Sequence, residues 1–287
     1  MHSLTTLLLV SSTAFAFPAT KQAPAAEIKC PIVFEGRVPV GTPPTDFDSY
    51  ATSKLYNPDY VKGNDLKWST ILQFPTVTPS RFDGEDHSAL EVTISDKSIF
   101  QKQNGFRRAG LQFLKDSADG PESTGVKTLH FSVKQDQARP LNLTHEYLNA
   151  WHEAADYSNN QIQFQAGQII GKSASDKNNF KFLDRNGKSL YSVAINQKEW
   201  QNFAITLDYE KNQVRIYYSL AGDALRSVAG PTSVNLAGGG QFQIGILKKP
   251  TGTNDVVNSG YQSKNLNEGQ IYGGVFLEDS AGGCVSL

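Results

Sequence analysis

The chain has 287 residues and a formal net charge of −1 at pH 7, so it carries no excess of positive charge for binding nucleic acid. Beyond the N-terminal segment no stretch is apolar for long enough to span a bilayer, and we therefore expect neither a nucleic-acid nor a membrane partner. Cys30 and Cys284 are the two cysteines, too few to hold a structural zinc ion by themselves.

Residues 1–16 predict a secretory signal peptide. The run Leu4–Val10 is apolar and Ala14-Phe15-Ala16 is a small-x-small cleavage signal, although His2 is the sole charge of the leading segment. Residues 17–29 are rich in Pro, Ala and Lys and predict a flexible leader. We therefore expect a secreted, extracellular protein.

Residues 30–287 predict one domain, because no linker, low-complexity block or repeat interrupts them. Cys30 and Cys284 lie at the two ends of this domain, and in an oxidising compartment they could form one disulfide that ties the termini together. The alternative is two unpaired buried thiols. One glycosylation sequon is present, Asn142-Leu143-Thr144, with Asn142 as the expected acceptor.

Short apolar or alternating segments, separated by turn signals, predict strands along the whole domain. These segments are Trp68–Phe74, Leu90–Ile94, Leu129–Val133, Ile162–Ile169, Phe203–Tyr209, Val214–Ser219, Phe242–Leu247 and Ile271–Leu277. About a dozen strands with almost no helical periodicity predict an all-β fold, a jelly-roll sandwich of two antiparallel sheets. One curved sheet of such a sandwich can offer a concave glycan cleft to an extended polymer.

The stretch 144–154 holds the densest chemistry in the chain, with two carboxylates, two imidazoles, a Tyr and a Trp. A strand would send alternate residues to opposite faces. One face would carry His145, Tyr147, Asn149, Trp151 and Glu153, and the other Glu146, Leu148, Ala150 and His152. Rings that can stack on sugars, beside carboxylates that can bind hydroxyls, are typical of a sugar cleft; the alternative is a strand that half-faces solvent.

Two further segments alternate in the same way. Arg108, Gly110 and Gln112 lie opposite an apolar set, and Gln161, Gln163 and Gln165 do so in a later strand. A glycine inside a strand often marks the close approach of a ligand or of another backbone. Three strands with polar faces predict the floor of one cleft, although each could instead simply face solvent.

Six segments stand out for their order along the whole mature domain: Cys30–Pro39, Glu91–Phe100, Gly105–Ala109, Pro140–Tyr147, Asn202-Phe203-Ala204 and Gly245–Gly252. In this order they resemble segments of fungal glycoside hydrolase family 131 proteins. The resemblance implies a β-jelly roll, secretion, no metal or other cofactor, and acidic residues in an open cleft. It also implies hydrolysis of β-glucans with β-1,3, β-1,6 or β-1,4 linkages. We accordingly expect a β-glucan polysaccharide or oligosaccharide as partner of a monomer.

Glycoside hydrolysis generally needs two carboxyl groups that flank the scissile bond, and the stretch 144–154 supplies Glu146 and Glu153 as catalytic candidates. Strand alternation favours Glu153, whereas the resemblance favours Glu146; either could instead be a structural carboxylate. Other side chains are expected to bind substrate, the arginines by orienting carboxylates or hydroxyls, the Tyr and Trp rings by stacking, and the glutamines by hydrogen bonding. The histidine is expected to hydrogen-bond the substrate or to tune a neighbouring Glu. A lysine could reach the cleft edge or merely solvate a strand end. These candidates are Arg107, Arg108, His145, Tyr147, Trp151, Gln163, Gln165 and Lys248.

The chain departs from the family pattern at three positions. The resemblance implies a catalytic Glu after Phe-Arg-Arg-Ala, where this chain has Gly110, and His where it has Gln201 and Gln243. Losing one of two catalytic carboxylates removes a contribution of roughly 10²- to 10⁴-fold. If the cleft keeps its shape, Gly110→Glu should raise turnover. An active glucanase with other acids, a slow enzyme and a glucan-binding protein without turnover all remain open, as does a cell-wall structural protein.

Overall fold

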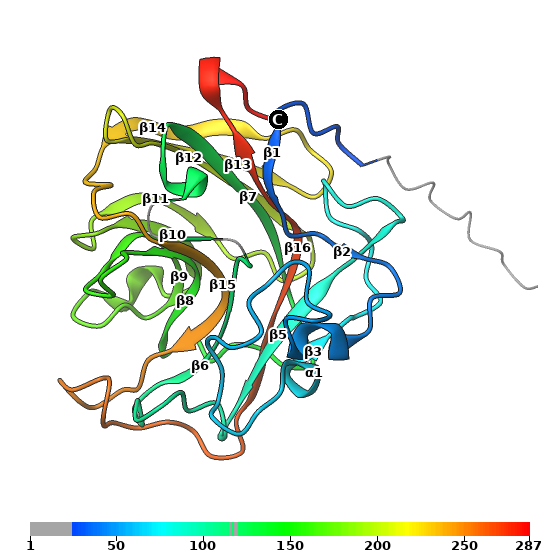
Figure 1. Cartoon of the computed structure of the whole chain (residues 1–287). Helices are drawn as coiled ribbons and strands as arrows, with labels where there is room; N and C mark the ends of the chain where they lie inside the picture. Colours follow the sequence, from blue (N-terminus) through cyan, green and yellow to red (C-terminus); the bar gives the residue numbers. More distant parts are fainter. Residues whose placement is uncertain (1–24, 115, 118–119) are drawn as a thin grey trace, which may run out of the picture.

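We describe a computed structural model of the chain, which covers residues 25–114, 116–117 and 120–287 (Figure 1). The predicted signal peptide, residues 1–16, and the first part of the predicted leader lie outside the described residues. The chain forms two large antiparallel sheets and one short two-stranded ribbon, with four brief 3₁₀ turns and one short helix among the described residues. The expected all-β sandwich of antiparallel sheets is confirmed.

The larger sheet has eight strands in the order β14-β13-β12-β7-β16-β5-β3, with β1 also paired to β16. Its strands are β1 (Ile32–Glu35), β3 (Leu72–Gln73), β5 (Leu90–Ser95), β7 (Val126–Gln135), β12 (Gln201–Asp208), β13 (Gln213–Leu220), β14 (Arg226–Ser233) and β16 (Asn267–Asp279). Figure 1 shows β16 as a long strand through the middle of the molecule.

The smaller sheet has six strands in the order β11-β10-β9-β8-β15-β6. They are β6 (Arg107–Gln112), β8 (Glu146–Glu153), β9 (Asn160–Gly167), β10 (Asn179–Asp184), β11 (Ser189–Ala194) and β15 (Gln241–Lys248). The two-stranded ribbon joins β2 (Val38–Pro39) to β4 (His87–Ser88), and the remaining elements are η1 (Pro44–Asp48), α1 (Trp68–Ile71), η2 (Pro121–Ser123), η3 (Ala174–Asp176) and η4 (Ala281–Gly283).

The main core lies between the two sheets and is rich in phenylalanine. The ring of Phe164 on β9 lies 4.9 Å from that of Phe131 on β7 and 4.7 Å from that of Phe203 on β12, centroid to centroid. All three rings are buried, and each such burial contributes about 1.5–3 kcal/mol. The alternating apolar residues of the predicted strands therefore face the opposite sheet, and their polar neighbours face away from it.

One predicted strand is wrong in its first half. Residues Trp68–Ile71 form the helix α1, and only Leu72–Gln73 of the predicted segment pair as a strand. Tertiary contacts override the apolar pattern here. The Trp68 indole donates to the carbonyl of Pro58 (3.1 Å), and Asp48 accepts from both the backbone and the hydroxyl of Ser69.

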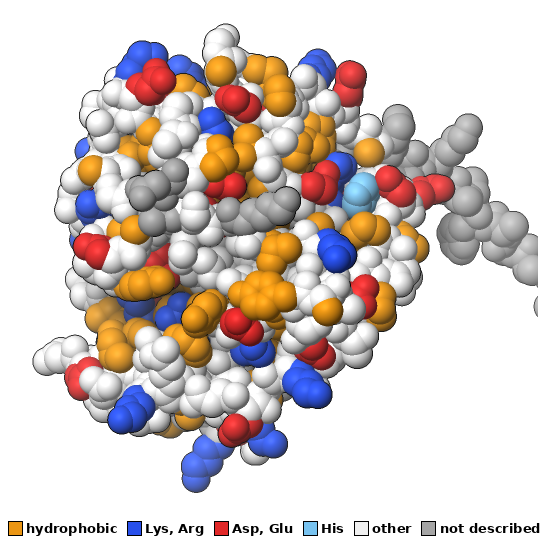
Figure 2. Space-filling model, viewed as in Figure 1, with side chains coloured by type: hydrophobic (Ala, Val, Ile, Leu, Met, Phe, Trp, Pro, Cys, Tyr) orange, Lys and Arg blue, Asp and Glu red, His pale blue; other side chains and the backbone are white. Residues whose placement is uncertain are grey.

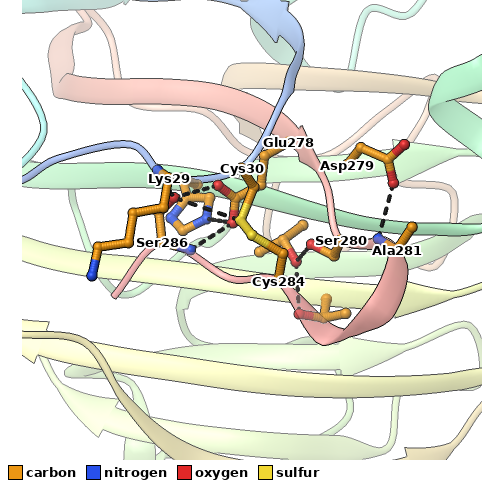
Figure 3. Close-up of a disulfide and its surroundings, with 11 residues drawn as sticks. Lys29, Cys30, Glu278, Asp279, Ser280, Ala281, Cys284 and Ser286 are labelled. Carbon is orange, nitrogen blue, oxygen red and sulfur yellow. Dashed lines mark hydrogen bonds and ion pairs between the residues drawn. A yellow bond between two sulfur atoms is a disulfide. The ribbon is translucent and has the colours of Figure 1, made fainter.

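The disulfide between Cys30 and Cys284 is present, with a Cα–Cα distance of 5.9 Å across 254 positions of sequence, as predicted (Figure 3). Beside it, the hydroxyl of Ser286 donates to Glu278 Oε2 (2.6 Å), and His130 Nε2 contacts Glu278 Oε1 (2.8 Å). Both ends of the domain are thereby tied to β16. No helix among the described residues is long and apolar enough to cross a membrane.

Candidate active site

A cavity of about 600 Å³ opens on the face of the six-stranded sheet that is turned away from the core. We call this face the cavity face. Arg108 and Gln112 of β6, Gln241 and Gln243 of β15, and Glu153 of β8 point into the cavity from the sheet, and loop residues complete its walls. Figure 2 shows the molecule hollowed where Figure 1 labels β6, β8 and β9, with Lys or Arg atoms visible inside the hollow.

Glu153, the last residue of β8, brings one carboxyl group to the cavity. Gln243 Nε2 donates to Glu153 Oε2 over 2.8 Å. Burial raises the pKa of the Glu153 carboxyl above its ordinary value, while the charge of Arg108 and the Gln243 hydrogen bond oppose that rise. The carboxyl therefore has a hydrogen-bond donor and a nearby cation, and it makes no direct ion pair with any of the residues that the structure describes.

Asp116 brings a second carboxyl group to the same cavity. The backbone N–H of Phe242 donates to Asp116 Oδ2, and Oδ1 has no hydrogen-bond partner among the described residues. Burial raises the pKa of Asp116 to about 8; the backbone hydrogen bond opposes this shift and the charge of Glu122 adds to it. Asp116 was not predicted from the sequence, because only its contact with a strand 126 residues away brings it to the cavity.

Arg108 is the buried cation of the cavity, only 6% exposed. Its guanidinium lies 5.8 Å from the centre of the Phe100 ring, and Nη1 donates to Gln103 Oε1 over 3.2 Å. Burial lowers the pKa of Arg108 and Glu153 raises it, so the two groups stabilise each other's charged forms. The predicted position of Arg108 on the cavity face is thus confirmed.

The exposed aromatic rings of the cavity are tyrosines that sequence analysis did not select. Tyr60 is 49% exposed and Tyr157 is 68% exposed, and both line the cavity wall. Tyr157 lies in the turn between β8 and β9 with a φ of +60°, a left-handed conformation that L-residues seldom adopt. Such conformations are often retained at functional sites. Both rings offer flat faces beside carboxyl and amide groups, an arrangement suited to sugar rings.

The family model described as the glycoside hydrolase 131 catalytic N-terminal domain matches residues 32–283. The chain belongs to glycoside hydrolase family 131. No curated protein sequence matches the chain.

Solved structures of two family 131 proteins share the fold. The catalytic domain of a GH131 β-glucanase from Podospora anserina is 19% identical, with a TM-score of 0.73, and the match covers 89% of this chain and 97% of that one. The catalytic domain of a family 131 protein from Coprinopsis cinerea is 22% identical, with a TM-score of 0.69, covering 88% of this chain and 95% of that one. At these identities the likeness shows the fold alone.

The family resemblance implies a Glu at the position where this chain has Gly110. A Cβ atom there would lie 2.8 Å from Gln243 Oε1 and 3.0 Å from Trp151 Cη2. The Trp151 indole therefore fills the space that a side chain at residue 110 would need. The backbone at Gly110 is not left-handed, so the obstacle to a larger residue is the neighbouring side chains. This packing weighs against the expectation that Gly110→Glu would simply restore a carboxylate.

Trp151 itself is 2% exposed and packs with Phe106, Leu148 and Leu247 on the cavity face. It does not line the cavity, so the structure gives it no accessible face on which to stack a sugar. Trp151 instead packs beside Gln243, its partner on β15, and against the backbone at Gly110.

Tyr147 faces the core, not the cavity, because the alternation along β8 breaks at Asn149. The pairing of β8 shifts register against β9 between Leu148 and Ala150, and against β15 at the same level. Leu148 and Trp151 consequently share the cavity face, whereas Tyr147 is fully buried and donates to Glu268 Oε2 over 2.7 Å. The expectation that Tyr147 and Glu153 share a face is wrong.

Glu146, His145 and Lys248 lie at the opposite end of β8 from Glu153. Glu146 Oε1 pairs with Lys249 Nζ at 2.5 Å, and its Oε2 accepts from the backbone N–H of Ile170. His145 Nδ1 contacts the carbonyl oxygen of Lys249 over 2.8 Å, and burial lowers the pKa of its ring. The fully buried Lys248 donates to Glu268 Oε1 over 2.6 Å. None of these three side chains lines the cavity.

The other predicted residues lie around the sheet. Arg107 donates to the carbonyls of Asn104 and Phe106 at one end of β6, outside the cavity. Gln163 and Gln165 share the cavity face with Trp151, since they pair with Trp151 and Leu148, and Gln165 Nε2 donates to Gln163 Oε1 over 2.8 Å. They lie beyond the cavity itself.

The sequon residue Asn142 is exposed, and its Oδ1 accepts from the Thr144 hydroxyl over 2.8 Å. Among the described residues no group of three or more His, Cys, Asp or Glu side chains is placed to hold a metal ion.

Proposed function

We propose that this family 131 chain is a secreted hydrolase of β-glucan that uses Glu153 and Asp116. The observation that carries the proposal is that two carboxyl groups, in different environments, line one open cavity beside Arg108. Glycoside hydrolysis needs such a pair, one group protonated and the other ionised. Pairs of titratable groups whose surroundings separate their pKa values mark acid and base assignments.

Asp116 serves as the general acid. Its pKa of about 8 keeps the carboxyl protonated at neutral and mildly acidic pH. The N–H of Phe242 donates to Oδ2, and the buried Oδ1 has no hydrogen-bond partner among the described residues, so we place the acidic proton on Oδ1. In the reaction the Asp116 carboxyl gives this proton to the glycosidic oxygen as the bond from that oxygen to the anomeric carbon breaks.

Glu153 serves as the ionised partner. Arg108 and the Gln243 amide both favour the carboxylate form, against the effect of burial. The carboxylate stabilises positive charge as it develops at the anomeric carbon, and it acts there as base for water or as nucleophile. Gln243 fixes one carboxylate oxygen, so the other is free to face the substrate.

The lining of the cavity supports a glucan as substrate. Amide side chains of Asn57, Gln112 and Gln241 offer both donors and acceptors to sugar hydroxyls, and the tyrosines Tyr60 and Tyr157 offer ring faces. The Podospora protein of the same family is a β-glucanase. We extend that substrate class to this chain, with β-1,3, β-1,6 or β-1,4 linkages as the candidates.

The signal peptide predicted over residues 1–16 supports secretion, and the disulfide is of the kind that persists in oxidising compartments.

A second candidate function is β-glucan binding without turnover. The observation that favours it is the packing at Gly110, where the family resemblance implies a Glu and where a Cβ atom would lie 2.8 Å from Gln243 Oε1 and 3.0 Å from Trp151 Cη2.

Reducing-sugar release from laminarin and cellulose separates the two functions. We expect Glu153→Gln and Asp116→Asn each to lower kcat/KM by roughly 10²- to 10⁴-fold. The matched control is Asp156→Asn, which removes an exposed carboxylate from the turn that follows β8, outside the cavity. Brisk hydrolysis by both active-site variants would show that other acids act. No hydrolysis by the wild type, combined with calorimetric binding of glucan, would establish the binding protein.

A further inference from the structure

Residues 50–61, part of which lines the cavity, carry a further exposed aromatic ring outside it, that of Tyr50. Asn57 lines the cavity, and its backbone N–H donates to the carbonyl of Gln112 over 2.8 Å, which fixes it to β6. Its side-chain Oδ1 accepts from the Tyr50 hydroxyl and from the backbone N–H of Asp59, both at 2.9 Å. One amide oxygen therefore joins the cavity wall to a ring outside it.

Tyr50 and Tyr60 are both large exposed rings of this segment. Tyr50 is 55% exposed and is not part of the cavity lining, whereas Tyr60 is. The pKa of the Tyr50 phenol is raised by desolvation and by the nearby Asp59 and Tyr60, which places all three groups in one neighbourhood. Tyr50 is thus joined through Asn57 to the cavity wall, which Tyr60 also lines.

The segment that presents these rings is held firmly. Val61 exchanges two backbone hydrogen bonds with Gly110, of 2.8 and 2.9 Å, along the edge of β6 that no other described strand of the sheet pairs with. Between the two tyrosines Tyr56 is buried, and its hydroxyl donates to the carbonyl of Gly36 over 2.8 Å. Because the Tyr50 hydroxyl already bonds to Asn57, the side chain loses less conformational freedom when a ligand stacks on its ring.

We propose that Tyr50, joined through Asn57 to the cavity wall, forms a distal subsite for further sugar units of a β-glucan chain bound in the cavity. Sugar rings present C–H faces that pack on aromatic faces, while their hydroxyls stay in water, and tyrosine suits such half-wet contacts. The subsite rests on the proposed function, because the chain that reaches Tyr50 is the one held beside Glu153. It makes the protein select long glucans over short oligosaccharides.

An exposed tyrosine is not by itself a sugar subsite, because Tyr261 is exposed but lies away from the cavity. Tyr261 is 63% exposed, but its ring lies 6.5 Å from that of His145, at the far end of β8 from Glu153. It neither lines the cavity nor bonds to a residue that does. Tyr261→Ala is therefore the matched control for the loss of an exposed tyrosine.

The test compares laminarin with a laminari-trisaccharide as substrates of the wild type, Tyr50→Ala, Tyr50→Phe and Tyr261→Ala. We expect Tyr50→Ala to lower the ratio of kcat/KM for laminarin to that for the trisaccharide about 3- to 10-fold, through KM. Tyr50→Phe keeps the ring but loses the bond to Asn57, so its ratio should fall less. Tyr261→Ala should leave the ratio at the wild-type value.

Calorimetry with a laminari-hexasaccharide and the trisaccharide keeps the subsite testable if the wild type does not hydrolyse glucan. The wild type should then bind the hexasaccharide more tightly than the trisaccharide, and Tyr50→Ala should remove most of that difference. An absence of turnover would overturn the proposed catalytic function only. An unchanged ratio in Tyr50→Ala, or equal effects of Tyr50→Ala and Tyr261→Ala, would overturn the subsite whatever the turnover.

Discussion

The two ends of β8 carry one glutamate each, and their surroundings differ in kind. Glu146 is 3% exposed and fully engaged, with an ion pair to Lys249 on one oxygen and the N–H of Ile170 on the other. Glu153 is half-buried, and an amide donates to one oxygen while the other faces the cavity. A carboxylate with both oxygens satisfied stabilises the fold, whereas one with a free oxygen beside a cavity can act on a ligand.

Neutralising each glutamate in turn tests which of the two acts on the substrate. We expect Glu153→Gln to lower hydrolysis by roughly 10²- to 10⁴-fold with little change in stability. Glu146→Gln should leave kcat/KM near the wild-type value and cost about 1–3 kcal/mol of unfolding free energy, because the buried ion pair is lost. Reducing-sugar assays and denaturant titrations measure the two effects. The reverse assignment, with activity lost in Glu146→Gln, would make the Glu146 end catalytic.

A second variant tests whether the Glu146 end is structural. Lys248 is fully buried and pairs with Glu268, which also accepts from Tyr147. Lys248→Met leaves a buried carboxylate without its cation, and we expect a loss of about 3–5 kcal/mol in denaturant unfolding. The double variant Lys248→Met/Glu268→Leu should recover much of that loss, since an apolar pair of similar volume can replace a buried ion pair. A Lys248→Met protein of wild-type stability would contradict a structural role.

Gly110 offers a smaller test at the Glu153 end. Gly110→Ala should cost about 1–3 kcal/mol, because the new methyl group lies within 3.1 Å of Gln243 and Trp151 atoms. In a Trp151→Phe background the crowding six-membered part of the indole is gone, so Gly110→Ala should cost less there. The coupling is read from a double-mutant cycle of unfolding free energies. Additive costs would show that Trp151 does not fill the space of residue 110.

Local alternation was enough to predict part of the site. Ala109, Leu111 and Phe113 face the core, so Arg108 and Gln112 reach the cavity as the sequence of β6 predicts. The disulfide also followed from the sequence, since two cysteines at the ends of a domain that is expected to be secreted have one natural pairing. Most of the strands were likewise predicted, because each carries its own apolar pattern.

What the sequence did not reveal depends on contacts between distant segments. The register shift at Asn149 reverses the face of Tyr147, and it is set by the pairing of β8 with β9 and β15. Asp116 lies in a loop with no periodic pattern and reaches the cavity only through the N–H of Phe242. Tyr60 and Tyr157 lie in connecting segments, where alternation carries no information about direction.

The smallest expected effect concerns the charge that sets the proton affinity of Asp116. A general acid works only while it is protonated, so kcat/KM should fall as pH rises through the Asp116 pKa of about 8. The nearby Glu122 is buried, and its negative charge disfavours ionisation of Asp116, which raises that pKa. Glu122→Gln removes the charge and should move the alkaline limb to lower pH, by about half a unit, or ~0.7 kcal/mol. Glu146→Gln, at the other end of β8, should leave the limb in place. A limb that moves to higher pH in Glu122→Gln, or that persists unchanged in Asp116→Asn, would show that another group supplies the proton.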